Sequence, residues 1–91
     1  LTIRKPDLER FPALRLAFQA GRAGGTAGCI FNGANEEAVH QFRQGNISFV
    51  KISEMIEGAL NSIEVQKADQ LETIRSADER TRQWVRKQIK K

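Results

Sequence analysis

The sequence predicts an all-α fold, a small four-helix bundle-like domain with a short extended connector between helices two and three. Four segments carry apolar residues at the three- and four-residue spacing of an amphipathic helix, separated by glycine and other turn-forming residues. The chain has 91 residues, of which 40% are hydrophobic and 29% charged. This is enough for one modest core, so we expect a single helical domain, 1–91.

The first expected helix spans residues 12–23. Pro12 suits the first helical position, where its missing amide proton is not needed. Gly24 and Gly25 should end the helix, because glycine readily adopts the left-handed conformation of a helix C-terminus. One face carries the residues expected to enter the core, namely Phe11, Leu14, Ala17, Phe18 and Gly21.

The second expected helix opens at Asn32, whose side chain can accept hydrogen bonds from free amides of the first turn. Glu36 and Glu37 follow in the early turns, where a negative charge meets the positive end of the helix dipole. Gly45 should stop this helix. Its apolar stripe comprises Ala34, Ala38, Val39 and Phe42.

Residues 47–50 are β-branched and aromatic but too few for a stable strand without a partner. We expect them to form an extended connector that places Ile47 and Phe49 in the core. The third helix follows and has the clearest helical spacing in the chain. Its apolar residues are Ile52, Met55, Ile56, Ala59, Leu60 and Ile63.

Residues 64–75 are mostly polar and are expected to form a loop. The fourth helix should begin at Ser76, because Ser76 and Glu79 have the spacing of a capping box. Its predicted apolar face is Ala77, Thr81, Trp84, Val85 and Ile89. Such short helices are marginal alone in water, so their stripes must bury one another.

No catalytic, cofactor-binding or metal-binding residue can be assigned. His40 and Cys29 are the single histidine and the single cysteine, too few for a zinc site with ordinary ligand spacing. A Cys–His pair would also need an orienting group and an oxyanion pocket. We therefore interpret Cys29 as packing and His40 as a surface residue. The glycine-rich segment 22–28 resembles a phosphate loop only loosely, since it lacks a preceding strand and a Lys-Ser/Thr pair.

The net charge of +4 is concentrated in the last helix, where seven Lys/Arg lie between Arg75 and Lys91. A basic helix can contact nucleic acid or an acidic partner. A solvated face is the favoured interpretation, because no aromatic residues are interleaved. No apolar run is long enough to span a membrane. One unpaired cysteine suits a reducing compartment, so we expect a soluble cytoplasmic protein.

A more specific signal is a set of residues in one order at one spacing. It includes Phe11-Pro12-Ala13-Leu14-Arg15-Leu16-Ala17-Phe18, Ala20-Gly21-Arg22-Ala23-Gly24-Gly25-Thr26, Asn32-Gly33-Ala34-Asn35-Glu36-x-Ala38-Val39, Phe42 and Gly45-x-Ile47-Ser48-Phe49-x-x-Ile52. This pattern resembles the C-terminal domain of the 1-deoxy-D-xylulose 5-phosphate reductoisomerase family. The resemblance is close from residue 1 to about 60 and looser to the last helix.

The resemblance implies an enzyme of three parts: an NADPH-binding domain, a catalytic domain with a divalent metal ion (Mg or Mn), and this helical domain. It implies isomerisation and NADPH-dependent reduction to 2-C-methyl-D-erythritol 4-phosphate in the non-mevalonate route to isoprenoids, by a homodimer when full length. No catalytic or ligand-binding residue of the family carries over to this segment. The segment alone is therefore expected to be inactive. The alternative is a free-standing basic helical module that binds nucleic acid or an acidic partner protein.

Asn32, Asn35 and Glu36 match the family motif, and we interpret them as helix-capping and packing groups. The sequence departs from the family at Gly33, where alanine is usual, and at Lys51, where aspartate is common. Losing that aspartate removes a cap of the third helix and leaves Ser48 or Ser53 as substitutes.

Overall fold

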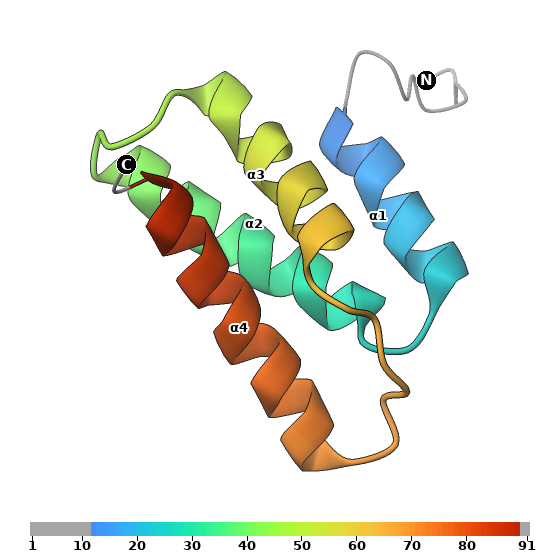
Figure 1. Cartoon of the computed structure of the whole chain (residues 1–91). Helices are drawn as coiled ribbons and strands as arrows, with labels where there is room; N and C mark the ends of the chain where they lie inside the picture. Colours follow the sequence, from blue (N-terminus) through green and yellow to red (C-terminus); the bar gives the residue numbers. More distant parts are fainter. Residues whose placement is uncertain (1–11, 90–91) are drawn as a thin grey trace, which may run out of the picture.

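The computed structural model describes residues 12–89, which form four helices and no strand. Figure 1 shows their order along the chain. The helices are α1 (Pro12–Ala23), α2 (Ala27–Arg43), α3 (Phe49–Ser62) and α4 (Leu71–Ile89). The predicted all-α fold of four helices is confirmed, and the bounds of the first helix are as predicted.

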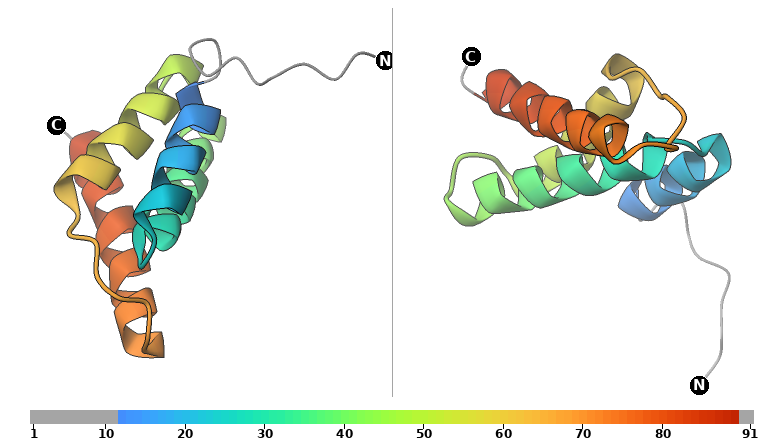
Figure 2. Two further views of the ribbon diagram at one scale, coloured as in Figure 1. Left: turned by 90° about the vertical axis from the view of Figure 1, so that its right-hand side faces the viewer. Right: turned by 90° about the horizontal axis from the view of Figure 1, so that it is seen from below.

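The second helix is the centre of the assembly. Helix α2 packs against each of the other three helices, whereas α1 contacts α2 and α3 but does not reach α4. Figure 2 shows the same arrangement from the side and from below, with α1 and α4 apart. Helices α2, α3 and α4 therefore form a three-helix body, and α1 lies against one side of it.

The core contains residues from all four helices. Its buried members are Leu16, Ile30, Ala34, Ala38, Ile52, Ile56, Ala59, Ala77 and Val85. The predicted stripe of α3 is confirmed, since Met55, Leu60 and Ile63 also pack against this core. Trp84 and Ile89, predicted on the inner face of α4, are partly buried against it. A regular stripe with neighbours on both sides thus behaves as its spacing predicts.

The predicted core face of α1 is wrong. Leu16 and Ala20 are buried, with 0% and 3% of their surface exposed, whereas Leu14 and Phe18 are 36% and 47% exposed. The inner strip of α1 is narrow because it fits between α2 and α3. Gly21 is exposed too, and Phe11 lies outside the described residues.

The predicted start of the second helix is also wrong. Helix α2 begins at Ala27, and Asn32 lies within the helix with an exposed side chain. The helix begins early because the Ala27 amide donates to the Gly24 carbonyl (3.1 Å) and the Ile30 amide to the Thr26 carbonyl (3.0 Å). The predicted end is confirmed: α2 stops at Arg43, and Gly45 adopts a φ of 79°.

The connector between α2 and α3 is shorter than predicted. Ile47 packs against the core as expected, but Phe49 belongs to the first turn of α3 and is 73% exposed. Ser48 occupies the N-cap position without a side-chain cap bond. Lys51 forms an ion pair with Glu54 at 3.0 Å. Phe49 faces outward because the stripe of α3 centres on Ile52 and Ile56.

Helix α4 begins at Leu71, one turn before the predicted capping box. Ser76 lies inside the helix, and Glu79 accepts a hydrogen bond from Gln83 (3.0 Å) instead of reaching back to Ser76. The first turn is closed by the Ile74 amide, which donates to the Gln70 carbonyl (3.2 Å). Leu71 is 62% exposed, so apolar burial gives no signal for this turn.

Among residues 12–89, no helix is both long enough and apolar enough to cross a membrane. The longest, α4, has 19 residues but carries both acidic and basic side chains.

Candidate functional site

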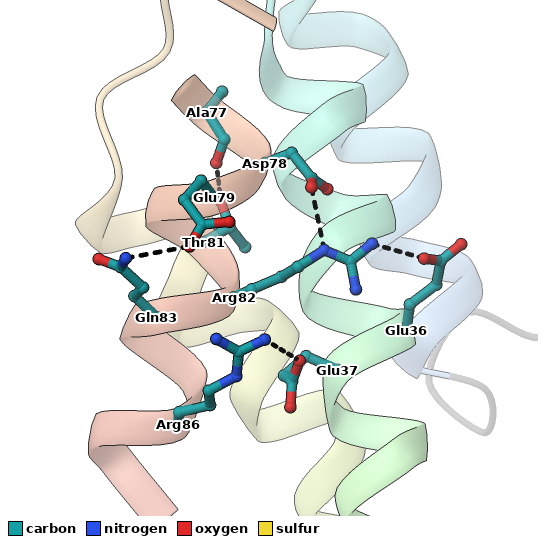
Figure 3. A network of polar contacts seen from close by, with 9 residues as sticks. All are labelled: Glu36, Glu37, Ala77, Asp78, Glu79, Thr81, Arg82, Gln83 and Arg86. Carbon is teal, nitrogen blue, oxygen red and sulfur yellow. Dashed lines mark hydrogen bonds and ion pairs between the residues drawn. The ribbon is translucent and has the colours of Figure 1, made fainter. Parts of the chain in front are cut away.

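The most organised polar feature is a set of ion pairs between α2 and α4, which we call the α2–α4 clasp. It consists of Glu36, Glu37, Asp78, Arg82 and Arg86. Figure 3 shows the two arginines of α4 reaching across to the two glutamates of α2. Glu36 pairs with Arg82 and Glu37 with Arg86, so each arginine has its own partner on the facing helix.

Arg82 is held from two sides. Its Nε donates to Asp78 Oδ2 at 3.0 Å, one turn earlier on α4, and its Nη2 donates to Glu36 Oε2 at 2.5 Å. These hydrogen bonds, to Asp78 first and then to Glu36, raise the pKa of Arg82. The side chain is 24% exposed, so solvent screens the pairing only in part. Asp78 thereby aims the Arg82 guanidinium at α2.

Glu37 is the buried acid of the clasp, with 5% of its surface exposed. Its carboxylate accepts hydrogen bonds from Arg86 Nη2 (3.1 Å) and Gln41 Nε2 (2.9 Å). Burial raises the pKa of Glu37, but the hydrogen bonds from Gln41 and Arg86 and the charges of Arg86 and His40 outweigh it. The net pKa lies below the ordinary 4.5, so the ionised form is the stable one in the fold.

A glycine on α2 leaves room for the clasp. Gly33 is buried, and a Cβ at this position would lie 2.9 Å from Asp78 Oδ1 and 3.6 Å from Thr81 Cβ. Thr81 is fully buried and satisfies its hydroxyl by donating to the Ala77 carbonyl at 2.7 Å. An alanine at position 33 would therefore require Asp78 to shift.

The glycine-rich turn binds another part of the chain. The Thr26 amide donates to the Gln66 carbonyl, and the Gln66 amide donates to Thr26 Oγ1, both at 2.8 Å. At Gly25, with a φ of 55°, any Cβ would collide with the same Gln66 carbonyl oxygen. This Thr26–Gln66 clamp occupies the amide and the hydroxyl of Thr26, so these two groups have a structural role.

The three residues of the predicted motif, Asn32, Asn35 and Glu36, lie in different surroundings. Asn32 lines an open groove of about 520 Å³ with Cys29, Arg75 and other residues of α4. Asn35 is partly buried and lines a second groove on α2 beside Glu36. Glu36 pairs with Arg82 in the clasp. The structure therefore does not bring the three together as one site.

Within residues 12–89, no group of three His, Cys, Asp or Glu side chains could hold a metal ion. His40 is exposed, as predicted, and Cys29 is partly buried against the core, also as predicted. These residues therefore do not fit the divalent metal that the family resemblance implies.

The basic helix is less free than its sequence suggests. Arg82 and Arg86, two of its cations, turn back onto α2 and are neutralised by Glu36 and Glu37. Lys90 and Lys91 lie outside the described residues. The clasp was missed at the sequence level, because nothing in the spacing of the acids at 36 and 37 and the arginines at 82 and 86 indicates that they face each other. These two cations are paired within the fold, and the pairing reduces their attraction for phosphates.

Comparison with known families decides the identity of this helical arrangement. The model of the DXP reductoisomerase C-terminal domain matches residues 1–84. The chain belongs to the DXP reductoisomerase C-terminal domain family. The match contains α1, α2, α3 and most of α4, and it includes every residue of the clasp except Arg86.

Three relatives, each described as a 1-deoxy-D-xylulose 5-phosphate reductoisomerase, give the extent of the similarity. The protein of Leptospira interrogans is 45% identical over 86 residues, which are 94% of this chain and 22% of the relative. The protein of Geobacillus sp. is 48% identical over 86 residues, which are 94% of this chain and 23% of the relative. The protein of Desulforamulus reducens is 43% identical over 91 residues, which are 100% of this chain and 22% of the relative. The chain thus spans little more than a fifth of the length of these curated DXP reductoisomerases.

Proposed function

We propose that this chain is the C-terminal helical domain of a longer enzyme that converts 1-deoxy-D-xylulose 5-phosphate to 2-C-methyl-D-erythritol 4-phosphate. The observation that carries the proposal is the match of residues 1–84 to the family, together with 43–48% identity to the three reductoisomerases. In this proposal NADPH and a divalent metal ion bind to the remaining domains. In this proposal the longer enzyme is a homodimer, as the family resemblance implies, and is cytoplasmic, because a single cysteine suits a reducing compartment.

The proposed role of this domain is structural. Its charged contacts in the clasp join α2 to α4, and the amide and hydroxyl of Thr26 in the glycine-rich turn are bound to Gln66. Of the three motif residues, Glu36 belongs to this role through its ion pair with Arg82, and Asn35 is partly buried on the same helix, whereas Asn32 is exposed. A domain arranged in this way supports an active site made elsewhere in the polypeptide.

The test compares the longer protein with the isolated chain. The longer protein should oxidise NADPH when 1-deoxy-D-xylulose 5-phosphate and Mg²⁺ are added. The isolated chain should show no such oxidation and no saturable binding of NADPH by calorimetry. If the longer protein lacks this activity, the proposed enzymatic function is wrong. If the isolated chain binds NADPH, the proposed purely structural role of the domain is wrong.

The alternative, a module that binds nucleic acid, is tested with the same isolated chain. Its affinity for duplex DNA at physiological salt should be no better than the non-specific range of roughly 10⁻⁴–10⁻⁶ M. The pairing of Arg82 and Arg86 within the fold supports this expectation. A nanomolar, sequence-dependent complex would favour the alternative.

A further inference from the structure

Helix α1 has apolar side chains on two opposite faces. Leu16 and Ala20 enter the core, whereas Leu14 and Phe18 are 36% and 47% exposed. With 3.6 residues per turn, Phe18 lies about 160° around the helix from Leu16. Leu14 and Phe18 are one turn apart, so they form a continuous apolar strip pointing away from the body.

A glycine continues this strip. Gly21 lies one turn after Phe18, is exposed, and would have nothing within 4 Å of an added Cβ. Glycine inside a helix costs about 0.5–1 kcal/mol relative to alanine. No contact among the described residues explains why position 21 has no side chain. A surface with an exposed Phe beside a bare stretch of helix suits close approach by another part of a protein.

We propose that the outer face of α1, defined as Leu14, Phe18 and Gly21, is the surface on which the preceding part of the same polypeptide docks. This inference rests on the proposed function. The chain matches a C-terminal domain and spans 22–23% of its relatives, so most of each relative lies before this domain. Helix α1 is the first described helix and therefore lies nearest in sequence to that part.

Connectivity favours this occupant over a separate molecule. A segment joined to α1 through a short stretch of chain meets its outer face at a high effective concentration. Such a contact needs less buried area than one between free proteins, because most of the association entropy is already lost. Helix α1 lies on the side of the body, away from α4 (Figure 2), and the exposed fractions of Leu14 and Phe18 show that the described residues leave this face partly uncovered.

A second exposed apolar cluster lies at the junction of α2 and α3 and consists of Phe42, Phe49 and Val50. The rings of Phe42 and Phe49 pack edge to face with centroids 5.7 Å apart, so they shield one another in part. This cluster is distant in sequence from the start of the domain. It provides an internal reference for the test, because Phe49 is 73% exposed.

The experiment is hydroxyl-radical footprinting of the longer protein that carries this chain. If the outer face of α1 is covered, Phe18 should be oxidised at least about fivefold more slowly than Phe49, because side chains at an interface core are shielded from water. Oxidation rates of Phe18 and Phe49 that differ only in proportion to their exposed fractions, 47% and 73%, would overturn the proposal. So would a Phe18 protection that disappears on dilution to the monomer, since a second copy would then be the occupant.

A variant and a matched control complete the test. Gly21→Leu should restore rapid oxidation of Phe18 in the longer protein, because the new side chain blocks close approach. Gly28→Leu should leave Phe18 protected, although Gly28 is equally exposed and has nothing within 4 Å. Protection that survives Gly21→Leu would overturn the role of this face. Footprinting does not depend on turnover, so its result is independent of the activity assay. An active enzyme with exposed Phe18 would refute only the docking face. An inactive protein with protected Phe18 would refute only the proposed activity.

Discussion

The three-helix body and α1 bury their apolar surface in different ways. In the body, Ile56 and Val85 are fully buried and the charged side chains face solvent or pair across helices. Helix α1 contributes Leu16 to the core but leaves Phe18 nearly half exposed on its other side. Only the Leu16 face of α1 is buried against the described residues, and the opposite face is the one proposed above as a docking surface.

The largest expected effect tests the centre of the body. Ile56→Ala should lower the free energy of unfolding by about 2–5 kcal/mol, through lost transfer energy and a cavity. Ile56 is 0% exposed in the middle of α3. Denaturant unfolding followed by the fluorescence of Trp84, the single tryptophan, measures the change.

The neighbouring residue provides the control for Ile56. Glu57→Ala removes an ion pair with Arg15 at 2.7 Å whose side chains are 51% and 43% exposed. Such a pair contributes at most about 1 kcal/mol. If both substitutions destabilise the chain equally, the helical phase of α3 in the core is wrong.

The second prediction separates the two faces of α1. Leu16→Ala should cost about 2–4 kcal/mol, because it also leaves a cavity. Phe18→Ala in the isolated chain should cost less than about 1 kcal/mol, as for other surface substitutions. Hydrogen exchange should show α1 opening in Leu16→Ala before the body unfolds, because α1 has few buried contacts. A larger loss for Phe18→Ala would place the core on the other face.

The third prediction compares a glycine in each region. Gly58→Ala should destabilise the chain by about 1–3 kcal/mol. Its new Cβ would lie 2.5 Å from Cη2 of Trp84, where α3 meets α4. Gly21→Ala should instead stabilise the isolated chain by about 0.5–1 kcal/mol, because its position is open and alanine favours the helix. Thermal melts of the two variants should therefore shift in opposite directions. A shift in the same direction would contradict the distinction between a closed body and an open α1 face.

The smallest predicted effect concerns the polar side of the body. Glu37→Gln should cost about 1 kcal/mol at neutral pH, because it removes the charge opposite Arg86. The folded pKa of Glu37 is lowered from 4.5. Its contribution to stability is therefore complete above 4.5 and is lost as the pH falls through the folded pKa. Urea unfolding across this range should show the wild-type chain converging on Glu37→Gln at acidic pH. A difference in stability between the two chains that stays constant with pH would exclude this titration. The control is Glu54→Gln, which removes an exposed pair with Lys51 and should change stability by no more than about 0.5 kcal/mol.

The body was more predictable from sequence than α1 was. The stripe of α3 centres on Ile52, Ile56 and Ala59, and all three are buried, because α3 packs against α2, α1 and α4. In α1 the larger residues Leu14 and Phe18 determine the pattern, but Leu16 and Ala20 fill the space between α2 and α3. Periodicity identifies an apolar face, and only the tertiary fit decides which of two faces enters the core.

The missed helix starts have a similar physical cause. Asn32 and Ser76 are good capping residues, yet α2 begins at Ala27 and α4 at Leu71. The start of α2 depends on Thr26, which Gln66 holds from far along the chain. Local capping signals contain no information about such a contact. The clasp depends likewise on the packing of α2 against α4, which the sequence predicted only in general terms.

The Thr26–Gln66 clamp also determines where the chain tolerates interruption. It fixes the connection between α3 and α4 to the α1–α2 turn, while residues 67–70 beyond it are all exposed. A peptide insert or a protease cut in 67–70 would leave the clamp and the α2–α4 clasp in place. The entropic cost of a longer loop grows only slowly with its length. The two sides of a break would remain joined through the core, so this short stretch offers a position for grafting a label or dividing the domain into complementing fragments.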